Sequence, residues 1–296
     1  MPEQIKVLFD TDIGTDIDDA VCLAYLLRQP RCELMGITTV AGEPEKRAML
    51  ASAVCRAAGR DDVPIHPGTG QPMIVPTHSP QAPQAVRLPH WPHREDLEPN
   101  SAVEFMRQVI RAHPNEITLL AVGPMTNLGL LFATEPQIPS LLKRLVLMCG
   151  VFTTQLPGLP YREWNAWGDP HATAIVYAAP VTPHLSVGLD VTMQCYLTPD
   201  EVRRRFKPPP LNVVVDLAEV WFRRADRITF HDPLAAALIF EPDICEYVEG
   251  KVDVELTTPR LFGMTHWSTE AGDTPHTIAL KVDPDRFFEH YFAITG

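Results

Sequence analysis

The sequence of 296 residues contains no apolar stretch long enough to form a transmembrane helix. Its first residues, Met1-Pro2-Glu3-Gln4, lack the basic and apolar regions of a signal peptide. The six cysteines include no Cys-x-x-Cys pair, which argues against a zinc site or a redox pair and favours reduced thiols in the core. These absences favour a cytoplasmic protein that does not enter a membrane.

Basic residues are scarce relative to acidic ones. The chain has 25 lysines and arginines against 37 aspartates and glutamates, which gives a formal net charge of -12. Nucleic-acid phosphates and anionic membrane surfaces would repel such a chain. A small neutral or cationic molecule is therefore a more suitable partner.

The chain alternates between short β-branched or aromatic segments and longer apolar segments, which is typical of an α/β protein. This alternation predicts a mainly parallel, Rossmann-like central sheet flanked by helices. Two segments near the C-terminus predict a small antiparallel hairpin beside it, whose loop holds residues 263–267. Since residues 207–211 form only a turn and no repeat is visible, we expect one domain over residues 1–296. The expected strands lie at 5–9, 33–40, 63–65, 117–122, 144–148, 184–189, 251–257 and 277–282, and the expected helices include 20–27, 45–58 and 211–227.

Residues 10–19, Asp-Thr-Asp-Ile-Gly-Thr-Asp-Ile-Asp-Asp, hold five carboxylates at the turn between the first strand and the first helix. Such turns lie at the carboxyl ends of the strands, where α/β sheets bind ligands. Two unit charges about 4 Å apart repel by roughly 4 kcal/mol at an effective dielectric near 20, whereas a helix N-terminus returns only about 0.3–1 kcal/mol per carboxylate. Helix capping by Asp16 or Asp18 explains a single acid, but bound Ca²⁺ or Mg²⁺ explains the set better. An EF-hand does not fit, because Thr15 and Val21 stand where its loop requires Gly and Glu.

Other segments leave two interpretations open. The proline-rich residues 64–99 form either a rigid surface crossover with solvated histidines or a loop that reaches the carboxyl ends of the strands. Thr126 or Asn127 could cap the helix that follows the 117–122 strand. Asp169-Pro170 and Asp232-Pro233 each match an N-cap followed by the first helical residue.

Taken together, the segments at the strand ends resemble the nucleoside hydrolases, or nucleoside N-ribohydrolases. The acidic turn is similar to that family's Asp-x-Asp-Pro-Gly-x-Asp-Asp motif, with Ile13 in the proline position and two additional residues, Thr15 and Asp16 or their equivalent. The other matching segments follow in family order over nearly the whole chain. They are Thr-Thr-Val-Ala-Gly at 38–42, Gly-Pro-Met-Thr-Asn at 123–127, Val-Leu-Met-Cys-Gly at 146–150, Glu-Trp-Asn at 163–165, His-Asp-Pro at 231–233 and Gly-Met-Thr at 263–265.

The resemblance implies hydrolysis of the N-glycosidic bond of ribonucleosides to ribose and free base. It implies a Ca²⁺ ion held by the carboxylates of Asp12, Asp19 and Asp232 and by the backbone carbonyl of Thr126. Asp10 would support these ligands. Asp18 would take a proton from the metal-bound water that attacks the anomeric carbon. Such cleavage passes through an oxocarbenium-like state, so a positioned and activated nucleophile is chemically reasonable.

The resemblance also implies the contacts to the substrate. Glu163 and Asn165 match ribose-hydroxyl ligands, Met148 would pack against the sugar, and His231 would donate a proton to the leaving base. Glu43 stands where the family commonly has Asn and could accept a ribose hydroxyl. The family's second ribose Asn and its His-containing, Gly-rich loop have no counterpart, so the identity of the base stays open. Family members are commonly homodimers or homotetramers, which we expect here too.

Two other functions fit part of the sequence. Residues 7–12 also resemble the strand and Asp-x-Asp motif of haloacid-dehalogenase-like phosphatases, with Asp10 as nucleophile. That family expects Thr or Val at position 14, where this chain has Gly14, and its Lys and later acidic pair are not evident. A catalytically silent, Ca²⁺-dependent nucleoside- or sugar-binding protein would use the same metal ligands but would not require Asp18 as a base.

Overall fold

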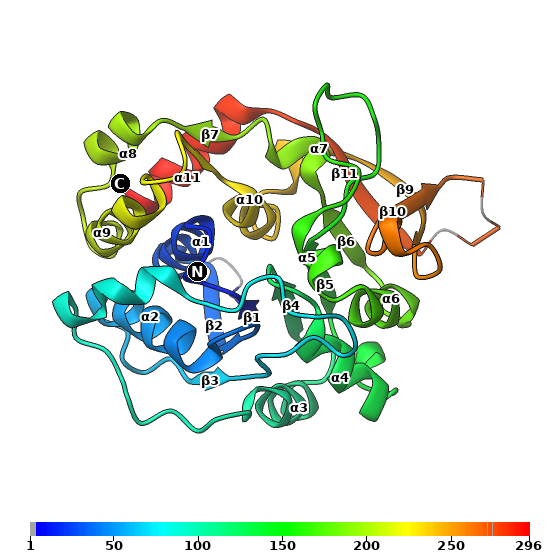
Figure 1. Cartoon of the computed structure of the whole chain (residues 1–296), viewed down its shortest axis with the longest axis horizontal. Coiled ribbons are helices and arrows are strands. Elements are labelled where there is room, and N and C mark those ends of the chain that lie inside the picture. Colours follow the sequence, from blue (N-terminus) through cyan, green and yellow to red (C-terminus); the bar gives the residue numbers. More distant parts are fainter. Residues whose placement is uncertain (1–3, 271, 274) are drawn as a thin grey trace.

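A nine-stranded sheet forms the centre of the computed structural model, which describes residues 4–270, 272–273 and 275–296 (Figure 1). Met1, Pro2 and Glu3 of the N-terminal stretch lie outside the described residues. Strands β7 (Tyr196–Leu197) and β8 (Ile228–Thr229) form a separate small sheet. In spatial order the strands of the main sheet are β10 (Thr265–Ser268), β9 (Cys245–Val254), β11 (His276–Val282), β6 (His184–Val187), β5 (Arg144–Met148), β4 (Ile117–Ala121), β1 (Ile5–Thr11), β2 (Cys32–Thr39) and β3 (Ile65–Pro67).

All strands from β3 to β11 in this order pair in parallel, which confirms the predicted Rossmann-like sheet. The chain passes from β1 to β2 and β3 on one side and returns to β4, β5 and β6 on the other. The strand order therefore reverses between β1 and β4, which is where open α/β sheets bind their ligands. The acidic turn follows β1 directly, so the fold places it at this reversal.

Helices cover both faces of the sheet. Val7 and Phe9 of β1 belong to the core on one face, whereas Leu8 between them belongs to the core on the other. The first core is completed by α1 (Asp18–Arg28), α2 (Pro44–Ala57), α9 (Leu211–Trp221), α10 (His231–Ala237) and α11 (Pro284–Thr295). The second is completed by α3 (Ala102–Ala112), α4 (Thr126–Thr134) and α6 (Pro170–Ala178). The remaining helical segments are α5 (Trp164–Gly168), α7 (Leu189–Thr192), α8 (Pro199–Arg205) and the 3-10 turns η1 (Pro83–His90), η2 (Pro139–Leu141), η3 (Pro242–Ile244) and η4 (Pro259–Leu261).

The C-terminal strands confirm the predicted antiparallel hairpin but differ from the prediction in their extent. β11 pairs antiparallel with β9 and joins the hairpin to the sheet by pairing in parallel with β6. Strand β9 begins at Cys245, before the expected residue 251, and most of the segment expected as a loop forms β10. Helix α9 ends at Trp221, so the predicted helix over 211–227 is too long.

Two of the predicted helix caps are wrong. Helix α4 begins at Thr126 without a side-chain cap, so neither Thr126 nor Asn127 has that role. Helix α10 begins at His231, which places Asp232 inside the first turn. By contrast, Asp169 accepts a hydrogen bond from the backbone amide of Ala172 and caps α6 as expected.

The proline-rich crossover packs against the acidic turn. Its 79–84 segment lies over that turn, where the backbone amide of Gln84 donates to the carbonyl of Gly14 at 3.1 Å. His66 stacks on Phe105 with 4.0 Å between ring centroids, and His78 stacks on Trp167 at 3.8 Å. The expectation that its histidines are solvated is therefore wrong for these two. The crossover instead reaches the carboxyl ends of the strands, as the second interpretation required.

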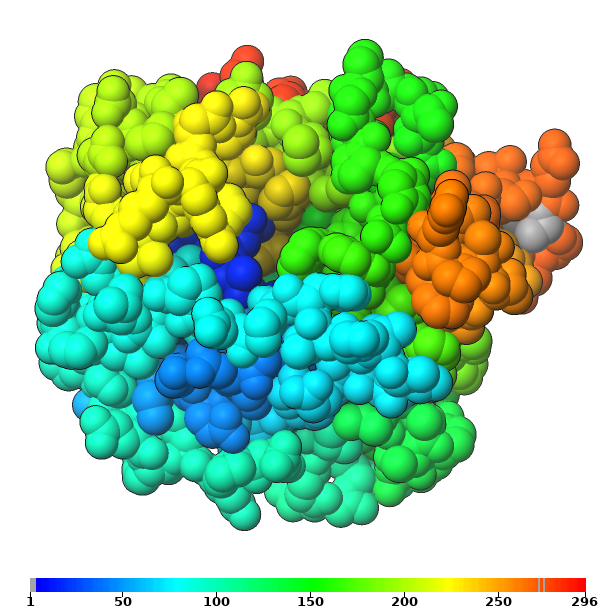
Figure 2. Space-filling view, in the orientation of Figure 1, coloured from blue at the N-terminus to red at the C-terminus, as the bar shows by residue number. Residues whose placement is uncertain are grey.

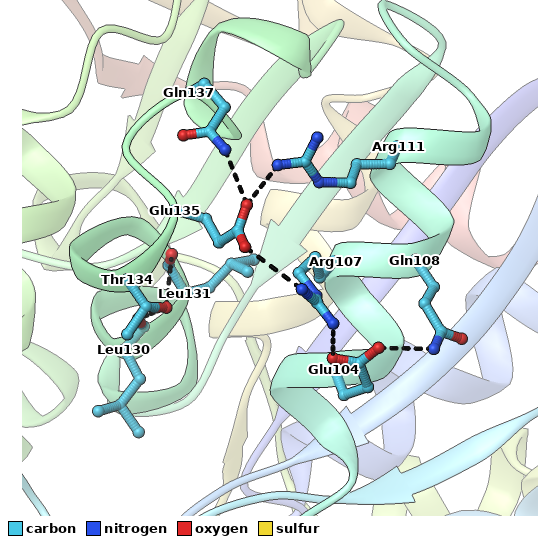
Figure 3. A network of polar contacts seen from close by, with 9 residues as sticks. All are labelled: Glu104, Arg107, Gln108, Arg111, Leu130, Leu131, Thr134, Glu135 and Gln137. Carbon is cyan, nitrogen blue, oxygen red and sulfur yellow. Dashed lines mark hydrogen bonds and ion pairs between the residues drawn. The ribbon is translucent and has the colours of Figure 1, made fainter.

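An exposed polar network joins α3 to the end of α4 (Figure 3). Glu135 accepts from Arg107 at 3.3 Å, from Arg111 and from Gln137 at 2.8 Å. Glu104 accepts from Arg107 and from Gln108 at 2.6 Å. These groups are partly exposed, so solvent screens the attraction between them and they contribute little to stability.

Within the described residues, no helix has both the length and the apolar character needed to cross a bilayer. All six cysteines are buried and unpaired, as the sequence predicted.

Candidate active site

A cavity of about 680 Å³ opens at the carboxyl ends of the parallel strands. Figure 2 shows the acidic turn, in dark blue, recessed between surfaces formed by the 70–90, 150–167 and 220–230 regions. Four carboxylates of the turn line the cavity. They are Asp12, Asp16, Asp18 and Asp19, and Asp232 of α10 faces them.

The carboxylates of Asp18, Asp19 and Asp232 converge in this cavity. One oxygen of each lies within 4.8 Å of the others, and each residue is only 3% exposed. At this separation each pair of charges repels by about 3 kcal/mol at an effective dielectric near 20. Burial, followed by the neighbouring negative charges, raises the pKa of all three well above the usual range. The cluster therefore favours either bound protons or a bound cation.

Local hydrogen bonds hold these carboxylates in place. Asp18 Oδ2 accepts from the backbone amide of Asp232 at 3.1 Å, which ties the start of α1 to the start of α10. Asp19 Oδ1 accepts from the hydroxyl of Thr11, which in turn accepts from the amide of Ile13 at 3.1 Å. Asp18 and Asp19 also occupy the first turn of α1, where the helix dipole favours negative charge.

Asp12 and Asp10 lie at the edge of this cluster. Asp12 lines the cavity but is not among the three most closely grouped carboxylates. Asp10 does not line the cavity; its Oδ1 accepts from Thr38 at 2.6 Å and from Asn127 at 2.8 Å. Its Oδ2 is buried without a partner, and burial raises the pKa of Asp10 to about 7. Asp10 therefore lies outside the cavity lining, and the hydrogen bond from Asn127 orients its carboxylate. The sequence had suggested Asn127 only as a helix cap.

Arg47 of α2 holds the acidic turn from below and was not identified from the sequence. The side chain is fully buried. Its Nη1 donates to the carbonyls of Asp12 and Ile13, its Nε to the carbonyl of Ala41 at 2.7 Å, and its Nη2 to Ser79 Oγ at 3.1 Å. All these acceptors are neutral, so the charge of Arg47 is balanced only through space by the acids above it. Arg47 follows Lys46 in the helix, and two consecutive basic residues in a helix are usually exposed to solvent. The sequence alone therefore does not show that Arg47 is buried.

Glu163, Asn165 and Met148, which the resemblance offered as substrate contacts, all line the cavity. Glu163 Oε1 accepts from the amide of Asn165 at 2.6 Å, and its Oε2 accepts from the amides of Gly150 at 3.1 Å and Ala166 at 3.0 Å. Asn165 Nδ2 donates to the carbonyl of Met148 at 3.0 Å. Burial raises the pKa of Glu163 to about 7. These three side chains supply one carboxylate, one amide and a thioether.

His231 also lines the cavity. Its Nδ1 lies 2.7 Å from the hydroxyl of Thr192. Burial lowers the pKa of His231 to about 4, so the ring is neutral at neutral pH. Since Nδ1 is engaged by Thr192, Nε2 is the ring atom available to a ligand.

Two predicted site residues do not line this cavity. Glu43 borders a separate surface depression, where it forms an ion pair with Lys46 and accepts from the amide of Ala82 at 3.0 Å. Thr126 lines a separate small pocket, and its hydroxyl donates to Asp169 at 2.8 Å. Val122 lines the cavity instead, and its carbonyl accepts from Asn165 at 2.6 Å. A sequence motif does not show which peptide of a turn faces the ligand.

Aromatic and basic side chains surround the mouth of the cavity. Trp164 and Tyr161 are exposed on one side, and Arg162 lies over the ring of Trp167 at 4.1 Å. On the opposite side, the guanidinium of Arg224 lies 4.8 Å from the ring of Trp221. The floor is thus acidic, whereas the mouth offers flat apolar surfaces suited to a planar ring.

The buried acids suit a hard divalent cation, because Ca²⁺ and Mg²⁺ prefer several carboxylate oxygens. Three mutually repelling carboxylates at the N-termini of α1 and α10, with a fourth beside them, have the donor chemistry that such an ion requires. Fold and site together define an α/β enzyme with an acidic centre at the reversal point of its sheet.

Comparisons with known proteins identify the family. The family model described as inosine-uridine preferring nucleoside hydrolase matches residues 7–289. Uridine nucleosidase 1 of Arabidopsis thaliana is 29% identical, with 96% of this chain and 91% of that protein covered. The solved structure of a plant nucleoside hydrolase superposes with a TM-score of 0.86 at 24% identity, covering 98% of each chain. A purine-preferring ribonucleoside hydrolase from Gardnerella vaginalis gives a TM-score of 0.84 at 24% identity, again over 98% of each chain.

The chain belongs to the inosine-uridine preferring nucleoside hydrolase family and is a hydrolase that acts on N-glycosyl bonds. The phosphatase alternative finds no support in this match. Asp10, which would be its nucleophile, does not line the cavity.

Proposed function

We propose that the protein hydrolyses the N-glycosidic bond of ribonucleosides to ribose and free base. The main observation behind this proposal is that one cavity is lined by a cluster of buried carboxylates together with polar and apolar side chains. These side chains are Glu163, Asn165, Met148 and His231. Family membership supports the same reaction. The name of the Arabidopsis relative favours a pyrimidine nucleoside, and that of the Gardnerella structure a purine nucleoside.

Ca²⁺ is the proposed metal. The carboxylates of Asp12, Asp19 and Asp232 would hold it, and the cavity lining favours the carbonyl of Val122 over that of Thr126 as a backbone donor. When bound, such a cation lowers the pKa of a water molecule and helps to orient it.

Asp18 is the proposed general base. Its Oδ2 is held by the amide of Asp232, which leaves Oδ1 to accept the proton of the attacking water. Burial, followed by the neighbouring carboxylates, raises the pKa of Asp18, so its carboxylate binds a proton more strongly than that of an exposed aspartate does. The loss of the water proton then increases the electron density available for attack on the anomeric carbon.

Glu163 and Asn165 would bind the ribose. Backbone amides already fix the Glu163 carboxylate, and its remaining acceptor capacity faces the cavity. Because Asn165 Nδ2 is engaged by the carbonyls of Val122 and Met148, Oδ1 is the atom that can accept from a ribose hydroxyl. A fixed sugar places the anomeric carbon near the base and the acids, which reduces the entropic barrier to reaction.

His231 is proposed to assist the departing base. Its ring is neutral at neutral pH, so we infer that Nε2 carries a proton and donates a hydrogen bond to the nitrogen on which negative charge develops. Such a bond stabilises the transition state more than the ground state.

The proposal is tested by a reducing-sugar assay on inosine, uridine, cytidine and adenosine with CaCl₂ present. We expect ribose release from at least one of them and no phosphate release from p-nitrophenyl phosphate. Tight binding of nucleosides without turnover would instead support the silent binding protein. Assembly into a homodimer or homotetramer stays a prediction, which light scattering checks.

A further inference from the structure

Asp16 is a fifth carboxylate of the acidic turn, and the proposed reaction gives it no role. It belongs to the Thr15 and Asp16 pair by which the turn exceeds the family motif. Its side chain lines the cavity and is partly exposed, whereas Asp18 and Asp19 are 3% exposed. Among the described residues it also lies outside the group of three closely spaced carboxylates. Asp16 is therefore nearer the mouth of the cavity than the acidic centre is.

The backbone around Asp16 is held from three sides. The carbonyl of Thr15 accepts from Arg224 at 2.6 Å, and the carbonyl of Asp16 accepts from Gln84 Nε2 at 2.8 Å. The hydroxyl of Thr15 lies 2.9 Å from that of Ser79. Gln84 is fully buried, whereas Arg224 is exposed. These contacts hold the backbone of Thr15 and Asp16, and the hydrogen bond from the amide of Ile17 to Asp16 Oδ1 orients the Asp16 side chain.

The carboxylate of Asp16 keeps acceptor capacity for a ligand. Its Oδ1 accepts from the amide of Ile17 at 2.6 Å, and the amide of Asp18 also contacts the carboxylate. A carboxylate offers about four acceptor positions, so part of its capacity stays open. The charge is offset in part by Arg224, which lowers the pKa of Asp16, although burial is the larger effect and raises it. An acceptor that lines a cavity and still has a free acceptor position can accept a hydrogen bond from a donor on the ligand.

In the proposed function, the leaving base would lie beside Asp16. In the proposed function, the ribose lies against Glu163, Asn165 and Met148, next to the buried acids of the floor. The base then extends toward the mouth, between the aromatic side chains. Trp221, Arg224 and Asp16 all line this part of the cavity, and Arg224 joins them by contacting both the Trp221 ring and the turn.

We propose that Asp16 is a specificity-determining residue that accepts a hydrogen bond from an N–H group of the leaving base. The assignment rests on the proposed function and deepens it. Suitable donors include N3–H of uracil and N1–H of hypoxanthine. A site built to hydrogen-bond a donor strongly rejects the analogue that lacks it, because the acceptor is then left unpaired. An N-methyl group at that position removes the donor and adds bulk against the carboxylate.

The test compares wild type, Asp16→Ala and Asp16→Asn on matched substrates. Uridine is paired with N3-methyluridine and inosine with N1-methylinosine, while 4-nitrophenyl riboside serves as the substrate whose leaving group has no N–H. We expect N-methylation to reduce the wild-type kcat/KM about 10- to 100-fold. In Asp16→Ala this discrimination should shrink to about threefold or less, and hydrolysis of the nitrophenyl riboside should stay within about threefold of wild type.

Asp16→Asn separates the two contacts of this side chain. Its amide oxygen can still accept from the amide of Ile17, so the start of α1 is preserved, but a neutral group replaces the charge. We expect it to fold like wild type in thermal unfolding and to lose the same discrimination. Asp62→Asn, an exposed residue paired with Arg60, is the matched control and should leave all substrates unaffected.

Three results would overturn the assignment while wild type cleaves nucleosides. Equal losses on uridine and on the nitrophenyl riboside would show that Asp16 acts on the sugar. A tenfold or greater loss of Ca²⁺ affinity in Asp16→Asn, measured by calorimetry, would make it a metal ligand. Unchanged discrimination would show that it does not contact the base. If wild type cleaves no riboside, the proposed function fails and this assignment fails with it.

Discussion

The buried acids make the stability of the metal-free protein depend on pH. Each acid whose pKa is higher in the folded state than in the unfolded state holds its proton longer when folded. Its stabilising contribution is complete below the unfolded pKa and is lost as pH rises through the folded pKa. The affected residues are Asp16 at about 6, Asp10 and Glu163 at about 7, and Asp18, Asp19 and Asp232, whose pKa values are raised well above the usual range. The metal-free protein should therefore lose stability as pH rises.

The window from pH 7.5 to 9.5 separates this effect from that of the histidines. Burial lowers the pKa of His231 to about 4 and also lowers the pKa values of five other histidines, so these residues act in the opposite sense while the unfolded state still binds their protons. This opposite contribution has ended above about pH 7.5, one unit above the unfolded pKa of about 6.5. The five are His66, His78, His184, His276 and His290. Each proton that the folded state retains and the unfolded state releases lowers the free energy of unfolding by about 1.4 kcal/mol per pH unit. Over the window this amounts to about 3 kcal/mol, or a decrease in Tm of about 5 °C for a chain of this size.

Bound Ca²⁺ should reverse the trend. The ion competes with protons for the same carboxylates, so it binds more tightly at high pH. At a concentration about 100 times its Kd it stabilises the folded state by about 2.7 kcal/mol. We therefore expect CaCl₂ to raise Tm, and to raise it more at pH 9.5 than at pH 7.5.

Differential scanning calorimetry on EDTA-treated protein, with and without CaCl₂ at both pH values, measures these shifts. Asp232→Asn should abolish most of the increase in Tm that Ca²⁺ causes. Asp62→Asn should retain this increase, because Asp62 is exposed, pairs with Arg60 and does not belong to the cluster. A Tm that neither falls with pH in EDTA nor rises with Ca²⁺, Mg²⁺ or Mn²⁺ would refute the interpretation of the cluster as a cation site.

Three further substitutions test individual side chains. Asp18→Asn should reduce kcat by about 10²- to 10⁴-fold while Ca²⁺ affinity changes little, as steady-state kinetics and calorimetry would show; a parallel loss of affinity would make Asp18 a metal ligand. His231→Ala should slow inosine or uridine far more than 4-nitrophenyl riboside, because an activated leaving group needs no hydrogen bond; equal losses would mean that His231 only positions the substrate. Arg47→Met should lower the free energy of unfolding by about 3–5 kcal/mol in urea titrations, because it leaves the carbonyls of Asp12 and Ala41 unpaired; a change below about 1 kcal/mol would contradict its structural role.

Local sequence patterns predicted the parallel sheet because its strands are short, apolar and followed by helices. The apolar run that begins at Ile5 and the acids that follow it specified both β1 and the site at its carboxyl end. The C-terminal strands were less predictable. Thr265–Ser268 contains exposed residues and pairs only with β9, so its strand conformation depends on a tertiary partner that the local pattern does not show.

The site was predictable where one motif supplies both the residue and its neighbours. Glu163 and Asn165 lie together on a short helix, and Asp18 and Asp19 lie on the first turn of α1, so a local motif fixes their relative positions. Glu43 was predicted as a substrate contact but does not line the cavity. It precedes the first residue of α2, and its side chain contacts Lys46 and the amide of Ala82 instead. Arg47 and Arg224 were missed because their partners are distant carbonyls, which leave no trace in a local pattern.

A proton NMR time course of inosine and uridine, in the presence of CaCl₂, tests the central claim most directly. The account predicts that signals of ribose and of the free base appear in equal amounts, and that EDTA or Asp18→Asn suppresses them. Nucleosides that stay intact with folded, Ca²⁺-loaded wild-type protein would contradict it.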